Sequence, residues 1–155
     1  MLEGETGETA EGRERFLKQA TPLASLPDEL LHLTADAMRP RDFATGERIV
    51  RAGEPGRALY VLVRGGAEVR VRTASGGTAT VVRMGRGECF GEMSLLSGDD
   101  ASADVVAGEA ARCLVLEREA FEGLVREQPG LLRAFVRLVT RRLHTTTAAM
   151  ATARE

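Results

Sequence analysis

The residues best suited to bind a ligand lie in one short stretch, from Phe90 to Ser94. Phe90 ends an apolar run, Gly91 permits a backbone reversal that a side chain would obstruct, and residues 92–96 can form one helical turn. The first amides of such a turn have no partner inside the helix, and the helix dipole adds a partial positive charge there. The stretch is therefore a candidate site for a phosphate or another small anion.

This stretch resembles the phosphate-binding cassette of cyclic-nucleotide-binding domains, which reads F-G-E-[LM]-[AS]-L-L, a short turn, then R-[ST]-A and a β-branched run. Residues 90–96 fit without a gap, and Ser102 and Ala103 match the second half. The resemblance implies that Glu92 accepts hydrogen bonds from a sugar hydroxyl; alternatively, its carboxylate only complements the helix dipole. The ligand-binding positions that it implies are Phe90, Gly91, Glu92, Met93, Ser94, Ala101, Ser102 and Ala103.

Ala101 stands where the resemblance places the arginine that grips the phosphate. Such a charge-assisted bond contributes about 1.5–3 kcal/mol, or roughly ten- to a hundredfold in affinity. Asp99, Asp100 and Asp104 lie close by in the sequence. A carboxylate about 8 Å from a phosphate opposes binding by about 2 kcal/mol at an effective dielectric near 20. Asp104 either repels a ligand in this way or contacts solvent, depending on the strand face on which it lies. We therefore expect cAMP or cGMP to bind weakly or not at all.

Other arginines are candidates to replace the missing cation. Arg83 and Arg86 precede the cassette, whereas Arg133, Arg137 and Arg141 are spaced by four along the last expected helix. In the family that helix folds over the nucleotide as a lid. The same stripe is more typical of a solvated helix face opposite an apolar one.

Glycines recur near every tenth residue from Gly46 to Gly87, which predicts short antiparallel strands joined by tight turns. The strands are expected over 47–51, 57–64, 67–73, 78–84, 103–107 and 111–117. Apolar residues at helical spacing predict helices on both sides of them, over 13–19, 27–39, 118–127 and 129–150.

This order of elements predicts a mainly β fold with flanking helices. It resembles the β-roll, or jelly-roll, of a cyclic-nucleotide-binding domain, with N-terminal helices and two C-terminal helices. Residues 43–56 support the resemblance, because they match the F-x-x-G-E-x-[IV] opening of the roll and the G-[DE]-x-[GA] turn that follows it. We expect an acidic, disordered tail over 1–12, a single domain over 13–150 and a short tail over 151–155.

The composition and the terminal segments of the sequence argue against several classes of function. The net charge of −2 at pH 7 gives no sign of a nucleic-acid or membrane binder. The first residues lack a secretory signal and no apolar run approaches membrane-spanning length, so we expect a cytoplasmic protein without membrane contact. Too few residues follow position 143 for a helix-turn-helix, so we expect no direct DNA binding.

The few cysteines and histidines argue against an enzyme. Cys89 and Cys113 lie in strand-like segments, which favours buried reduced thiols, and they are too few for a four-cysteine metal site. His32 and His144 are far apart in the sequence and show no spacing typical of a metal site or a catalytic group. We therefore expect neither enzymatic activity nor a cofactor.

Two functions remain open. The first is a non-enzymatic regulatory module in which cAMP, cGMP or a related ligand at the degenerate cassette repositions the C-terminal helices. The second is a protein–protein interaction or dimerisation module of the same fold that has lost nucleotide binding. For either, a homodimer is expected through an apolar seam of the last helix, made of Val136, Val139, Leu143, Thr147 and Met150.

Overall fold

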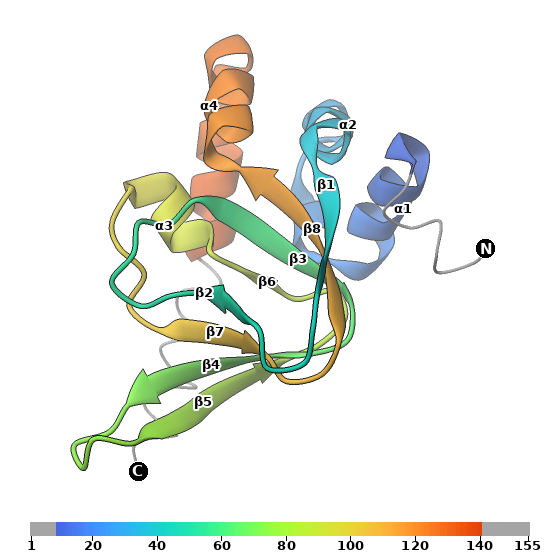
Figure 1. The fold of residues 1–155 in the computed structure, drawn as a ribbon. Helices are drawn as coiled ribbons and strands as arrows, with labels where there is room; N and C mark the ends of the chain where they lie inside the picture. Colours follow the sequence, from blue (N-terminus) through green and yellow to red (C-terminus); the bar gives the residue numbers. More distant parts are fainter. Residues whose placement is uncertain (1–8, 141–155) are drawn as a thin grey trace.

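A computed structural model describes residues 9–140 of the chain, which form a β-roll with helices on one side (Figure 1). The strands are β1 Arg39–Phe43, β2 Arg48–Val50, β3 Ala58–Arg64, β4 Ala67–Arg72, β5 Thr78–Met84, β6 Cys89–Phe90, β7 Asp104–Ala107 and β8 Ala111–Glu117. They pair as two four-stranded antiparallel sheets, in the orders β1-β8-β3-β6 and β2-β7-β4-β5.

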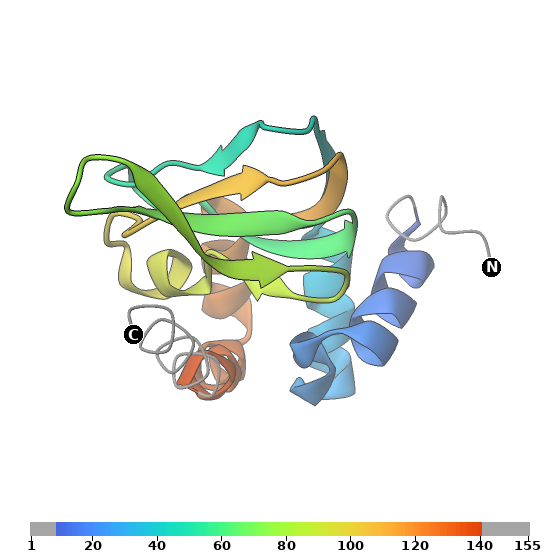
Figure 2. The same cartoon turned by 90° about the horizontal axis from the view of Figure 1, so that it is seen from below.

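The helices are α1 Ala10–Ala20, the 3₁₀ helix η2 Pro22–Ser25, α2 Asp28–Ala37, α3 Glu92–Ser97 and α4 Arg118–Glu127. Residues 129–140 form a further helix. Helices α1, α2 and α4 lie on the same side of the roll, whereas α3 interrupts the strand order between β6 and β7 (Figures 1 and 2). The predicted β-roll with N-terminal helices and two C-terminal helices is confirmed.

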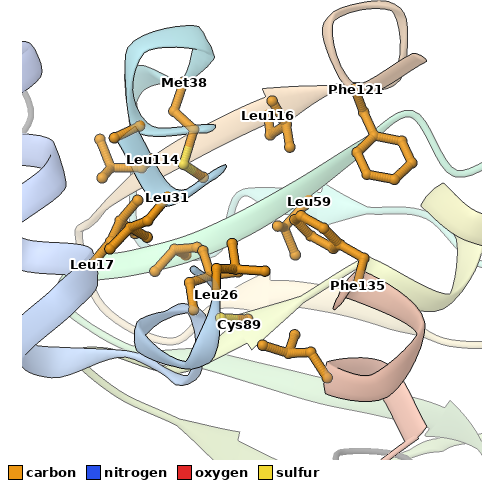
Figure 3. Close-up of a cluster of buried hydrophobic side chains, with 14 of the residues drawn as sticks. Leu17, Leu26, Leu31, Met38, Leu59, Cys89, Leu114, Leu116, Phe121 and Phe135 are labelled. Atoms are coloured by element: carbon orange, nitrogen blue, oxygen red, sulfur yellow. The ribbon is translucent and has the colours of Figure 1, made fainter. Parts of the chain in front are cut away.

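Strand β3 is buried on both faces because it separates two apolar clusters. Leu59 and Val61 pack against the helices, while Tyr60 and Leu62 fill the interior of the roll. Figure 3 shows the helix-covered cluster, in which Leu59 lies among side chains from α1, α2, α4 and the helix over 129–140. Burial on both faces explains why this strand is an almost uninterrupted apolar run.

Most expected elements are confirmed, and α4 and β5 have the expected bounds. Helix α1 begins at Ala10, earlier than expected, because the Thr9 hydroxyl caps it by accepting a 2.9 Å hydrogen bond from the Gly12 amide. Residues 10–12, expected in a tail, are therefore helical. Residues 1–8 of the expected N-terminal tail, together with residues 141–155, lie outside the described residues.

Strand β1 and the short helix η2 were not predicted from the sequence. Pro40 indicated only the end of the preceding helix, and it does follow α2, yet it also pairs with Leu114 within β1. A proline is tolerated there because β1 is an edge strand, so the missing amide hydrogen leaves no inner ladder bond unmade.

The two cysteines are buried free thiols, as expected. Cys89 belongs to the helix-covered cluster and Cys113 to the interior of the roll, so they lie on opposite faces of one sheet. Burial raises the pKa of the Cys113 thiol to about 12. This thiol is therefore a packing group and not a nucleophile at neutral pH. None of the described helices has both the length and the apolar character required to cross a membrane.

Candidate functional site

The first half of the predicted cassette folds as a tight strand-to-helix turn. Phe90 ends β6, and its ring stacks on that of Tyr60 at 5.0 Å between centroids. Gly91 caps α3 with φ at +89°, and a β-carbon at this position would lie 2.4 Å from the carbonyl oxygen of Ala58. Both the backbone conformation and the lack of space therefore require glycine here.

The residues of α3 differ in what they face. Glu92 is buried, with 8% of its surface exposed, although it opens the helix. Met93 points outwards and is 46% exposed. Ser94 lies against Gly56, where an added β-carbon would come within 1.8 Å of the Ser94 β-carbon. The loop before β3 therefore rests directly on the cassette helix.

An open pocket of about 120 Å³ lies beside the cassette. Its walls are β2, the loop over 51–57, the start of β3 with Tyr60, and the cassette residues Gly91 and Ser94. The other sequence-predicted positions, Phe90, Glu92, Met93, Ala101, Ser102 and Ala103, are not among its walls. Typical small-molecule sites have roughly 300–1,000 Å³, so this pocket is small for a nucleotide.

Ala101 is fixed against the pocket loop by its backbone. Its amide donates to the carbonyl oxygen of Glu54 at 2.9 Å, and its own carbonyl accepts from the Gly53 amide at 2.8 Å. The position that carries the phosphate-gripping arginine in the resembled cassette therefore adjoins the pocket loop. Its methyl side chain offers no hydrogen-bond donor.

Asp104 holds the same loop. Its Oδ1 accepts a 2.7 Å hydrogen bond from the Ala52 amide, and its Oδ2 lies 3.8 Å from Nε of Arg48. The carboxylate is therefore engaged with the protein and is only partly exposed, at 27%. Asp104 therefore has a structural role, which neither of the two expected alternatives, ligand repulsion and solvation, included.

The cations that the sequence suggested lie elsewhere. Arg83 is 3.8 Å from the carboxylate of Glu68, and Arg86 donates to the Val63 carbonyl at 3.0 Å with its guanidinium 4.8 Å from the ring centre of Phe16. Neither of these candidate replacement cations belongs to the pocket walls. The arginines that line the pocket are Arg48, Arg51 and Arg57.

The sequence pattern described as "Cyclic nucleotide-binding domain" matches residues 40–128, more than half of the chain. This chain belongs to the cyclic nucleotide-binding domain family. The matched region begins within β1 and ends one residue after α4, so it includes all of the roll except Arg39, together with the cassette and the pocket.

Relatives of the domain occur in larger signalling proteins. Human cGMP-dependent protein kinase 2 is 32% identical over 123 residues, which cover 76% of this chain and 16% of the kinase. A mutant regulatory subunit of a cAMP-independent protein kinase A from Trypanosoma brucei, bound to cAMP, has a TM-score of 0.75 at 28% identity and covers 90% of this chain. The Trypanosoma cruzi regulatory subunit bound to guanosine has a TM-score of 0.73 at 30% identity and covers 85%. The domain spans 48% and 45% of those two subunits.

Arg118 connects the pocket of this cyclic nucleotide-binding domain to its C-terminal helices. The residue opens α4, and its Nη2 donates to the carbonyl oxygens of Gly56 at 2.5 Å and Ser94 at 2.6 Å. Its backbone amide also donates to the carbonyl oxygen of Arg57 at 2.8 Å. One side chain thus holds the pocket loop, the cassette helix and the start of α4 together. Its neighbours in the sequence gave no signal for this role, because the contacts join segments far apart in the chain.

The helix over 129–140 places Arg133 and Arg137 at the surface and away from the pocket walls. Val136 is 47% exposed, whereas Val139 is only 6% exposed. The exposed surface of this helix therefore offers Val136 and not Val139, and the expected dimer stays a prediction. The remaining arginine of the stripe and the other seam residues lie outside the described residues: Arg141, Leu143, Thr147 and Met150.

No metal-binding cluster is found in the part of the chain that the structure describes. Between residues 9 and 140, no group of three or more histidine, cysteine or acidic side chains is placed to hold a metal ion. His32 lies on α2 and pairs with Glu14 of α1 at 2.5 Å between Nδ1 and Oε1. His144 lies outside the described residues.

Proposed function

We propose that this chain is a non-enzymatic regulatory domain that binds cAMP, cGMP or a related nucleoside through a cassette that lacks its phosphate grip. The observation that carries the proposal is the contrast between the two halves of the cassette. Gly91 and Glu92 keep the turn and the carboxylate, whereas Ala101 provides no cation at the position of the arginine.

The intact half favours the sugar of a ligand over its phosphate. A buried carboxylate such as Glu92 is suited to accept hydrogen bonds from ribose hydroxyls that a nucleoside and a cyclic nucleotide both offer. Without the arginine, the phosphate contributes about 1.5–3 kcal/mol less to binding. The proposed domain therefore discriminates weakly between a cyclic nucleotide and the corresponding nucleoside.

Two relatives support the inclusion of a nucleoside. The Trypanosoma cruzi regulatory subunit is bound to guanosine, which carries no phosphate. The Trypanosoma brucei subunit belongs to a cAMP-independent kinase, and its cAMP complex was obtained with a mutant of three substitutions, one of which introduces an arginine. Both cyclic nucleotides and nucleosides are therefore ligands to test on the present domain.

In this proposal, Arg118 couples ligand binding to the position of α4. A ligand that tightens the pocket loop over α3 displaces the Gly56 and Ser94 carbonyls that this guanidinium holds, and α4 begins at the same residue. A ligand that prefers one position of α4 shifts the population towards it. The receiver is proposed to be a protein partner in the cytoplasm, with neither direct DNA binding nor membrane contact.

A protein-interaction or dimerisation module of the same fold is the second candidate. It is favoured by the small pocket and by the exposed apolar side chains Leu132 and Val136 on the helix over 129–140. In this alternative the roll is a scaffold, and the last helix provides the contact with a second copy or with another protein.

Isothermal titration calorimetry of the full chain with cAMP, cGMP and guanosine separates the two candidates. Saturable binding of any of these ligands, lost in Glu92→Ala while circular dichroism shows the fold unchanged, supports the regulatory domain. If a folded chain binds none of them at millimolar ligand, the interaction module becomes the better description. Met93→Ala is a matched control, because this neighbouring side chain points outwards.

A further inference from the structure

We infer that Arg57, on the wall of the pocket, is the group that binds the phosphate of a cyclic nucleotide. The inference rests on the proposed function and names the part of the same site that recognises an anion. It follows from where Arg57 lies, how its backbone is held and which charges around it are already paired.

Arg57 is placed beside the cassette by close packing. It lines the pocket together with Gly91 and Ser94. The preceding residue, Gly56, has no room for a side chain because it rests on Ser94. Tyr60 lines the same pocket, and burial raises the pKa of its hydroxyl; Cys113 and Glu117 add to that rise, whereas the positive charges of Arg41 and Arg57 oppose it. Because Arg57 itself lines the pocket, a ligand there lies beside this residue.

The backbone that presents Arg57 is fixed. Its carbonyl oxygen accepts a 2.8 Å hydrogen bond from the Arg118 amide. The Arg118 side chain holds the adjacent Gly56 carbonyl through Nη2 at 2.5 Å and Nε at 3.1 Å. A side chain that starts from a fixed backbone loses less freedom on binding than one on a loose loop.

The pairing of charges distinguishes Arg57 from the other two arginines of the pocket. Arg48 lies 3.8 Å from the carboxylate of Asp104, and Arg51 lies 4.0 Å from that of Glu54. Within residues 9–140, the side chain of Arg57 has neither an ion pair nor a hydrogen bond, and it is exposed. An anion can therefore recruit the five donors of this guanidinium without breaking an existing pair.

The charge balance of the pocket agrees with this assignment. Asp104 lies beside Arg48 and Glu54 lies beside Arg51, whereas among residues 9–140 no carboxylate forms an ion pair with Arg57. Asp99 and Asp100 are exposed on the turn before Ala101, and Asp100 forms a β-bridge with Pro55 of the pocket wall. Of the three arginines of the pocket, Arg57 is therefore the one whose charge is not already paired.

The test compares cyclic nucleotides with nucleosides in two variants. Arg57→Gln removes the charge and keeps most of the length, and Arg72→Gln is the matched control, because Arg72 is exposed at the end of β4 and outside the pocket walls. Binding of cGMP, cAMP, guanosine and adenosine is measured by calorimetry at low and at physiological salt. We expect Arg57→Gln to weaken both cyclic nucleotides about tenfold at low salt and to leave both nucleosides unchanged. Arg72→Gln should change neither class.

The outcomes separate this inference from the proposed function. One outcome is that the wild type binds both nucleosides and cyclic nucleotides while Arg57→Gln weakens neither class, or weakens both equally. In that case Arg57 does not bind the phosphate, but the proposed regulatory function is still supported. If the folded wild type binds none of the four ligands, the proposed function fails and the inference fails with it. Arg57→Lys should recover part of the cyclic-nucleotide affinity, because it restores the charge but not the planar fork.

Discussion

The guanidinium of Arg118 donates a 2.6 Å hydrogen bond to the carbonyl oxygen of Ser94, and this contact joins the first turn of α4 to the cassette helix α3. The two residues are 24 positions apart in the chain. The bond uses a carbonyl in the middle of a helix of only six residues, 92–97, and therefore ties α4 to the short helix beside the pocket. A single side chain therefore links α3 directly to the start of α4.

Loss of the Arg118 side chain should destabilise the domain. Arg118→Ala removes charge-assisted bonds to Gly56 and Ser94, so we expect the free energy of unfolding to fall by about 1.5–3 kcal/mol in urea denaturation. Arg126→Ala, an exposed arginine in the last turn of the same helix, should change it by less than about 0.5 kcal/mol. Equal effects of the two substitutions would show that the contact of Arg118 with α3 does not contribute measurably to the free energy of unfolding.

Gly91 should tolerate alanine much less well than Gly76. Both have φ near +90°, so alanine strains the backbone at both positions by about 1–2 kcal/mol. At Gly91 the new β-carbon also lies 2.4 Å from the Ala58 carbonyl oxygen, whereas at Gly76 nothing lies within 4 Å. Gly91→Ala should therefore lower the thermal midpoint clearly more than Gly76→Ala. Similar midpoints in differential scanning calorimetry would mean that the cassette turn relaxes freely.

Local pattern was sufficient for most of the fold. The apolar spacing of α4 and the alternation and turn glycines around β5 are local signals, and both elements have the predicted bounds. Strand β1 was missed because Pro40 reads locally as a helix stop, and only the edge position of the strand explains why a proline is accepted there.

The sequence predicted only the part of the candidate site that is formed by consecutive residues. The turn at Gly91 followed from the residues around it, but the arginines of the pocket did not. Arg83 precedes the cassette closely in the chain, yet β5 directs it to Glu68. Arg57 is far from the cassette in sequence and adjoins it only because Gly56 packs on Ser94. Tertiary packing of this kind leaves no periodic pattern in the sequence.

The pair between His32 and Glu14 should make the stability of the domain decrease as pH rises above 6.5. The hydrogen bond and the charge of Glu14 raise the pKa of His32 above its ordinary value of 6.5. A raised folded-state pKa means that the stabilisation is complete below pH 6.5 and is lost as pH rises through the folded-state pKa. We expect the thermal midpoint to decrease slightly from pH 6 to pH 8. Glu14→Gln should flatten this decrease and return the NMR-titrated pKa of His32 towards 6.5; an unchanged titration would contradict the pairing.

The proposed homodimer should depend on the exposed face of the last helix. Val136 is 47% exposed there, so we expect Val136→Glu to convert a dimer into a monomer in sedimentation velocity at tens of micromolar protein. Arg137→Glu changes charge at the adjacent exposed position without removing an apolar contact, and it should leave a larger fraction of the dimer intact. A wild-type chain that sediments as a monomer at this concentration excludes the proposed seam.

An arginine at position 101 should strengthen the binding of cyclic nucleotides. Ala101 is only partly buried and its backbone is fixed to Glu54 and Gly53, so Ala101→Arg places a guanidinium beside the pocket loop without a need to rebuild the turn. The added fork should strengthen the binding of cAMP or cGMP at least tenfold at low salt, because it supplies about 1.5–3 kcal/mol and also screens Asp99 and Asp100. Guanosine lacks the phosphate, so its affinity should change little, and Ala101→Gln, which adds length without charge, should bring little gain for any ligand. Calorimetric titration of the three proteins measures these differences. If Ala101→Arg remains folded and still binds no cyclic nucleotide, the pocket is closed to the whole ligand class and the interaction module takes precedence.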